Sequence, residues 1–178
     1  MKDVCILGFD GALASAITGM TDLLSMAGVT WYVLHRETPR PAFRVRLLSR
    51  DARPIRCAHG LTLHADGDFN DAAGADVLLV PTIAADIRTT LEANPDLISV
   101  LRQAHRRNIL LAANCTGVFF LAEAGLLDGR AATTHWAYAQ SFRRRYPEVR
   151  LHPEQMVTED GPSCAPVVAP PGRISGST

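Results

Sequence analysis

Apolar residues along the chain follow two patterns, short unbroken runs and segments in which they are spaced three or four positions apart. Unbroken runs of four to eight residues are typical of strands buried on both faces of a parallel sheet, and the wider spacing is typical of amphipathic helices. Buried strands are therefore predicted at residues 4–8, 76–81 and 109–113. Residues 43–47 alternate between apolar and arginine side chains, which predicts a strand with one face closer to water.

Helices are predicted where the wider spacing is bounded by start and stop signals. Glycine just after the last apolar position, or proline at either end, supplies these signals. The predicted helices are residues 12–27 before Gly28, two pieces after residue 81 divided at Asn94-Pro95-Asp96, a segment after residue 117 ending at Gly125, and 136–146 before Pro147. Residues 54–64 predict a β-hairpin around His59-Gly60, and residues 131–134 predict a short extended segment.

Strands and helices thus alternate along the chain. This alternation predicts an α/β fold, with a mostly parallel sheet, helices on both faces, and a functional site at the carboxyl ends of the strands. The domain is expected to span residues 1–161. Four of the 11 prolines lie in the last 17 residues, so 162–178 are predicted to form an irregular, proline-rich tail, either native or a product of truncation or an altered reading frame.

Composition and charge narrow the class of protein. With 178 residues, 47% of them hydrophobic, the chain is long enough for one buried core. Eighteen basic residues balance 18 acidic ones, so no overall positive field attracts nucleic acid or an anionic membrane. The apolar runs are too short to span a bilayer, the first strand leaves no room for a signal peptide, and the four cysteines lack metal-type spacing. We expect a reduced, cytoplasmic protein without a metal or another cofactor.

The most informative chemical signal is the turn Asn114-Cys115-Thr116-Gly117, between the strand at 109–113 and the helix after it. A cysteine on such an elbow lies at the carboxyl edge of the sheet and faces the positive end of the helix, which favours the thiolate. The N–H groups of Thr116 and Gly117 could bind an anion or a carbonyl oxygen. The alternative is a small buried residue that closes a strand. The nearby glycine and the amphipathic helix favour the elbow.

Two other residues are candidates for the same site. His135 could face Cys115 as a Cys–His pair, or it could cap the helix that follows it. Asp10 follows the first strand and could lie at the same edge of the sheet, although capping of a helix near Gly11 is the favoured alternative.

Histidine and arginine clusters elsewhere give weaker signals. His59 and His64, with Asp66 and Asp68 nearby, leave a metal site open, although histidines beside a hairpin are more often surface residues. Residues 143–145 are three arginines late in a helix, which favours a solvated face over a DNA-binding patch.

The stretch from Cys115-Thr-Gly-Val-Phe-Phe to Ala131-Ala-Thr-Thr-His-Trp136 resembles the ThiJ/PfpI superfamily. The resemblance implies a flavodoxin-like fold, similar to that of the class I glutamine amidotransferases. More narrowly, the chain is similar to the amino-terminal domain of AraC-type transcriptional regulators. Residues 1–161 fit this pattern, including 60–66 and 76–81, but enzymes of the isonitrile hydratase type share it.

Three departures help to separate these relatives. The enzymes carry a carboxylate on the first helix that points at the elbow cysteine, whereas the matching position here is Ala16, which cannot transfer a proton. The family usually has Pro-Gly-Gly after the central strand, whereas this chain has Pro81-Thr82-Ile83. The family continues with a strand, a long helix and a DNA-binding module, whereas this chain continues with the proline-rich segment.

These departures favour a non-catalytic, ligand-sensing and dimerisation domain of an AraC-type regulator. Its expected partners are a small-molecule ligand, a second copy of the chain, and DNA only through a module absent from this sequence, with no membrane contact. One alternative is a cysteine-dependent enzyme in which Cys115 attacks a small substrate and Asp10 or Glu123 replaces the missing acid; another is redox sensing by Cys115. The candidate ligand-binding residues are Asp10, Ala16, Thr82, Ile83, Asn114, Cys115, Thr116, Gly117 and His135.

Overall fold

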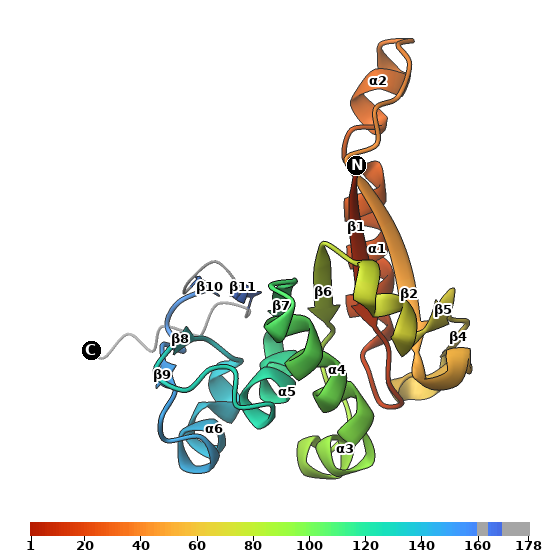
Figure 1. The fold of residues 1–178 in the computed structure, drawn as a ribbon. Coiled ribbons are helices and arrows are strands. Elements are labelled where there is room, and N and C mark those ends of the chain that lie inside the picture. The colour runs from red at the N-terminus through yellow and green to blue at the C-terminus, as the bar shows by residue number, and fades with distance from the viewer. Residues whose placement is uncertain (160–163, 169–178) are drawn as a thin grey trace.

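The computed structural model describes residues 1–159 and 164–168. Its centre is a seven-stranded sheet in the order β10-β11-β7-β6-β1-β2-β5 (Figure 1). Neighbouring strands are parallel except for β10 and β11, so the predicted α/β fold class with a mostly parallel sheet is confirmed. The strands are β1 (Lys2–Leu7), β2 (Phe43–Ser49), β5 (Gly67–Asp68), β6 (Val77–Val80), β7 (Leu110–Asn114), β10 (Val157–Thr158) and β11 (Cys164–Val168).

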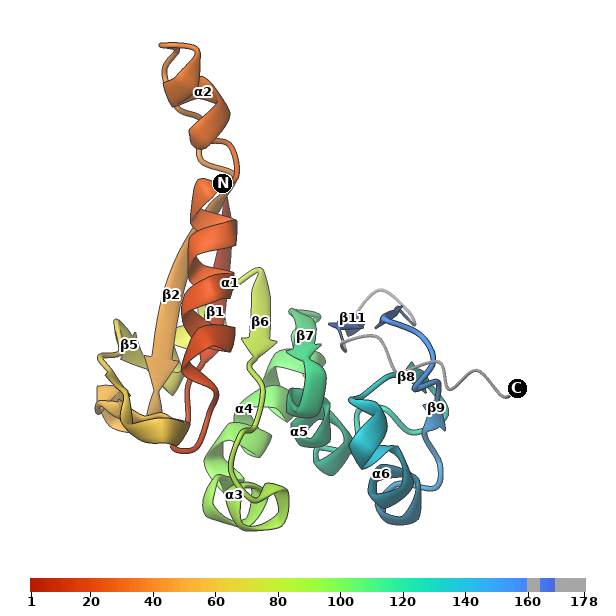
Figure 2. The ribbon, with the colours of Figure 1, turned by 180° about the vertical axis from the view of Figure 1, so that it is seen from behind.

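Helices cover both faces of this sheet, as predicted. Helix α1 lies on the face turned toward the viewer in Figure 2, and α4 lies on the opposite face. The helices are α1 (Ala14–Met26), α2 (Thr30–Leu34), α3 (Ile87–Ala93), α4 (Pro95–Arg106), α5 (Val118–Glu123) and α6 (Ala139–Arg145). Two small sheets pair β3 (Ile55–Arg56) with β4 (Thr62–Leu63) and β8 (Ala131–Ala132) with β9 (Arg150–Leu151). No helix within the described ranges has the length and apolar character needed to cross a bilayer.

The predicted stop and turn signals act through the backbone. Gly28 follows α1 with a φ of +75°, and a Cβ there would lie 2.1 Å from the carbonyl oxygen of Arg40. Pro95 begins α4, as expected for a residue without an N–H to donate. The hairpin of β3 and β4 turns through His59 and Gly60, whose φ values of +66° and +90° are left-handed.

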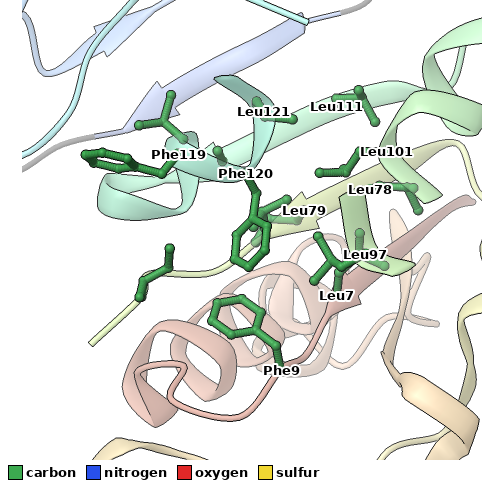
Figure 3. Packing of buried hydrophobic residues seen from close by; sticks show 14 of the residues in the cluster. Leu7, Phe9, Leu78, Leu79, Leu97, Leu101, Leu111, Phe119, Phe120 and Leu121 are labelled. Carbon is green, nitrogen blue, oxygen red and sulfur yellow. The ribbon is translucent and has the colours of Figure 1, made fainter. Parts of the chain in front are cut away.

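The apolar runs from which we predicted the buried strands contribute the side chains of the core, which lies between the sheet and its helices. In Figure 3, Leu7 of β1, Leu78 of β6 and Leu111 of β7 are directed toward Leu97 and Leu101 of α4. All five side chains are fully buried. Each such leucine contributes about 1.5–3 kcal/mol relative to an exposed one.

The prediction of an irregular tail over residues 162–178 is wrong for one segment. Residues Cys164–Val168 form β11, which pairs in parallel with β7 and antiparallel with β10. Val167 and Val168 are β-branched residues that suit a strand. Pro166 lies where the register shifts between Cys164 and Val167, and proline is tolerated at such an irregularity. The other residues of the predicted tail, 162–163 and 169–178, lie outside the described residues.

Candidate functional site

The turn after β7 is the predicted elbow. Cys115 has a left-handed φ of +53°, and the 3₁₀ turn Cys115–Gly117 leads directly into α5. A left-handed backbone at a residue with a side chain costs about 1–3 kcal/mol, so it persists only where the surroundings impose it.

Close packing against the end of β6 imposes this conformation. A Cβ on Gly117 would lie 2.6 Å from the carbonyl oxygens of both Val80 and Pro81, so only glycine fits there. The buried Thr116 donates its hydroxyl hydrogen to the carbonyl oxygen of Ile83 at 2.8 Å. The elbow is therefore fixed to the loop that follows β6.

That loop also connects the elbow to the first helix. The carbonyl oxygen of Thr82 accepts a hydrogen bond from the N–H of Leu13 at 2.9 Å, and Ile83 forms an isolated β-bridge with Ala12. Ala16 lies in the first turn of α1, directly after this connection. The structure thus brings the 82–83 loop, the start of α1 and the elbow to one edge of the sheet.

The electrostatics of the thiol differ from the sequence-based expectation. Burial raises the pKa of the Cys115 thiol, whereas hydrogen bonds from the N–H groups of Thr116 and His135 and from the hydroxyl of Thr82 act to lower it. The Thr82 hydroxyl is 3.4 Å from both oxygens of Asn114, a long contact that leaves its hydrogen free to turn toward the sulfur. The expected preference for the thiolate is wrong, because burial outweighs these hydrogen bonds and raises the pKa.

His135 does not form the proposed Cys–His pair. Its Nδ1 atom accepts a hydrogen bond from the N–H of Ala137 at 3.2 Å, which is the capping role considered as the alternative. Its ring packs against those of Trp136 and Tyr138, with centroid distances of 5.2 and 6.1 Å. The interaction with Cys115 that the structure shows comes from the backbone N–H of His135.

Neither substitute acid is directed at the thiol. The carboxylate of Asp10 accepts a hydrogen bond from the N–H of Arg56 at 2.9 Å and lies 3.8 Å from the guanidinium of Arg53. Asp10 therefore holds the β3 segment, and the favoured expectation that it caps a helix near Gly11 is wrong. Glu123 pairs instead with Arg145 at 3.0 Å and accepts a hydrogen bond from the Tyr146 hydroxyl at 2.5 Å.

The two aspartates of the weak metal hypothesis accept hydrogen bonds from backbone N–H groups instead. Asp66 accepts a hydrogen bond from the N–H of Leu47 at 2.8 Å, and Asp68 caps the 3₁₀ turn Phe69–Gly74. Within the described part of the chain, no three His, Cys, Asp or Glu side chains come together as metal ligands.

A cavity that the sequence-based reasoning missed lies beside the elbow. It has a volume of about 560 Å³ and lies between α3, α5 and α6. Phe119 of α5 and Tyr138, just before α6, are among its lining residues. No signal in the sequence distinguishes this cavity, because Phe119 and its neighbours in α5 are all buried.

The sequence of this domain matches a protein family and is similar to several known proteins. The model of the DJ-1/PfpI family matches residues 8–163. The HTH-type transcriptional regulator CdhR of Pseudomonas aeruginosa is 33% identical over 120 residues, which cover 67% of this chain and 34% of CdhR. An uncharacterized protein in the cpoL 5′ region of Streptomyces lividans is 32% identical over 144 residues, which cover 81% of this chain and 94% of that protein.

This chain is also similar to an enzyme and to the solved structure of a regulator. The isonitrile hydratase of Pseudomonas putida is 36% identical over 98 residues, which cover 55% of this chain and 42% of the enzyme. The crystal structure of an AraC family transcriptional regulator from Pseudomonas putida has a TM-score of 0.73 at 23% identity, and the match covers 93% of this chain and 83% of that one. The chain thus spans about a third of CdhR and less than half of the hydratase.

Proposed function

The chain belongs to the DJ-1/PfpI family, and from that premise we propose that it is a non-catalytic, ligand-sensing domain of AraC-type transcriptional regulation. In this proposal DNA is bound by a separate helix-turn-helix module, and the protein acts in the cytoplasm. The similarity to CdhR and to the AraC family regulator supports a regulatory role. The balanced charge of the chain supports the assignment of DNA binding to another module.

The observation that carries the non-catalytic assignment is the set of groups around Cys115. In residues 1–159, the hydrogen bonds that favour its thiolate come from Thr82, Thr116 and the backbone of His135. Acid–base catalysis needs a titratable group within about 2.6–3.2 Å of the proton that moves. The contacts of Asp10, Glu123 and the His135 ring lead elsewhere.

A turnover assay tests this proposal. We expect the purified protein to convert isonitriles, methylglyoxal and simple amides no faster than its Cys115→Ser variant. The Ala16→Asp variant places a carboxylate in the first turn of α1, and weak activity gained there and lost in Ala16→Asp/Cys115→Ser would support the explanation. Robust turnover by the wild-type protein that Cys115→Ser abolishes would overturn the sensor assignment.

A cysteine-dependent enzyme is the second candidate. The elbow and the similarity to isonitrile hydratase favour it. The raised pKa of the Cys115 thiol argues against it, and so does the alanine at position 16, where the enzymes carry a carboxylate. The raised pKa also weakens the redox-sensor hypothesis, because sulfenic acid forms on thiolates.

We also propose that the domain associates with a second copy of itself through its sheet-flanking helices. Large apolar side chains are exposed at the end of α1 and on α2, which projects beyond the sheet (Figure 2). They are Leu23, Met26, Trp31, Val33 and Leu34, here called the α1–α2 patch. Asp22, Arg36 and Glu37 supply charges of both signs beside it, which suits a surface that pairs with its own copy.

A further inference from the structure

The cavity between α3, α5 and α6 has the size of a small-molecule site. Its volume of about 560 Å³ lies within the range of roughly 300–1,000 Å³ that is typical of ligand pockets. Cys115 is not among its lining residues, so the cavity is distinct from the site around Cys115.

The floor of the cavity is apolar and aromatic. Leu91 of α3 and Phe119 of α5 line it, and each is only 2% exposed. In Figure 3, Phe120 is directed toward Phe9, at a centroid distance of 4.9 Å, whereas Phe119 is directed away from that contact. The ring of Tyr138 meets Phe119 edge-on at 6.4 Å. Tyr138 is 40% exposed, so its ring offers apolar surface to a flat, apolar group, and Phe119 supports that ring from below.

Three arginines and one aspartate lie around this floor. Asp86 uses its carboxylate to cap α3, where it accepts the N–H of Thr89 at 2.8 Å. Arg88 pairs with Glu92 at 3.2 Å, and Arg145 pairs with Glu123 at 3.0 Å.

Arg144 is the cation left for a ligand. Its exposed side chain forms no hydrogen bond or ion pair with any part of the chain that the structure describes. The arginine side chain binds carboxylates in a bidentate manner. The cavity therefore combines aromatic walls with one uncommitted guanidinium.

We propose that this cavity binds a small organic anion with a flat apolar body, such as an aromatic carboxylate. The ring of the anion lies against Tyr138, above the buried Phe119, and its carboxylate lies on Arg144. If the domain is a sensor, as proposed above, this anion is its effector class, and the inference rests on that proposal only for this regulatory role.

The cavity is connected to the elbow through two of its walls. Phe119 lies on α5, which begins directly after the turn Cys115–Gly117. Tyr138 contacts the His135 ring at 6.1 Å, and the backbone N–H of His135 is directed at the Cys115 thiol. An occupant of the cavity thus contacts both segments that hold the elbow, which suits an effector site.

Isothermal titration of the whole 178-residue chain with benzoate, benzamide and acetate tests the proposal. Benzoate has both the ring and the charge, benzamide lacks the charge, and acetate lacks the ring. We expect benzoate to bind at least about tenfold more tightly than either of the others, because only benzoate uses both the guanidinium and the aromatic walls.

Two variants locate the site. Arg144→Gln should weaken benzoate binding by about tenfold or more and leave benzamide binding unchanged. Arg106→Gln is the matched control, because it removes the same charge from an exposed position on α4 outside the cavity. Tyr138→Ala should weaken both ring-containing ligands.

Three results would overturn the proposal: no benzoate binding at about ten millimolar, equal affinity of Arg144→Gln and wild-type protein, or an equal loss in Arg106→Gln. The turnover assay judges the sensor proposal independently. Benzoate binding together with robust turnover would leave the cavity assignment standing and remove the sensor assignment. If neither benzoate binding nor turnover is observed, the cavity assignment is removed and the sensor assignment stands.

Discussion

At the scale of single residues, the backbone turn of the site could be predicted from the sequence, whereas the directions of the surrounding side chains could not. An apolar run, then cysteine, then glycine two positions later predicts the elbow, because the turn needs a residue without a Cβ against β6. The ring of His135 and the carboxylate of Asp10 choose among partners on distant segments. Those partners become neighbours only in the folded chain, so the sequence left both roles open or misassigned them.

The chemistry of Cys115 leads to a pH-dependent prediction. Cys5 is fully buried, and burial raises the pKa of its thiol to about 11, whereas Cys115 is partly exposed. We expect iodoacetamide to label Cys115 faster than Cys5 or Cys57. Because the pKa of Cys115 is also raised, its thiolate fraction is small at neutral pH, and its labelling rate should still increase beyond pH 9.0, the ordinary thiol value.

Mass mapping of labelled peptides across a pH series measures these rates. Thr82→Val removes a hydroxyl that favours the thiolate, so it should move the labelling profile of Cys115 to higher pH. Thr62→Val, in the exposed hairpin, should leave the profile unchanged. Equal rates at Cys5, Cys57 and Cys115, or a plateau near neutral pH, would contradict this account.

At the scale of elements, the helices and strands that the sequence predicted are those whose partners lie within the core. Strands β1, β6 and β7 are continuous apolar runs because helices cover both of their faces. Among the elements that the sequence-based prediction missed, α2 and β11 were missed for different reasons. Helix α2 buries none of its residues in this chain, so no polar-apolar spacing identifies it. Strand β11 carries a proline, and its pairing with β7 decides its conformation.

Two glycines on different elements should respond oppositely to alanine. Gly117→Ala forces a methyl group against the end of β6, 2.6 Å from two carbonyl oxygens, and should lower the free energy of unfolding by about 1–3 kcal/mol. Gly19 lies in α1 with no atom within 4 Å of an added Cβ. Gly19→Ala should therefore raise the free energy of unfolding by about 0.5–1 kcal/mol.

Urea denaturation of both variants measures the difference, with the wild-type protein as reference. A Gly117→Ala variant as stable as Gly19→Ala would mean that the elbow can move away from β6, against the tight packing described above.

At the scale of the whole molecule, the α1–α2 patch has no counterpart in the sequence-based prediction. Leu23 and Met26 belong to the predicted helix 12–27, and the other three residues of the patch follow its stop at Gly28, so nothing in the sequence groups them as one surface. The structure places these residues at the end of α1 and on the projecting α2, where the described residues leave them exposed (Figure 1). A stable interface requires about 800 Å² from each partner, so the neighbouring turns of α1 must also take part.

We expect a dimer in solution whose association depends on this patch. Leu34 is 73% exposed, and Leu34→Glu would place a charge in the shared surface, which should weaken association at least about tenfold. Leu61→Glu is the matched control, because Leu61 is 61% exposed on the separate β3–β4 hairpin. Light scattering across a dilution series should show that the wild-type protein and the Leu61→Glu variant are dimers. At the same concentrations the Leu34→Glu variant should be a monomer. A monomeric wild type at high concentration would refute self-association, and an equal effect of both substitutions would refute this surface.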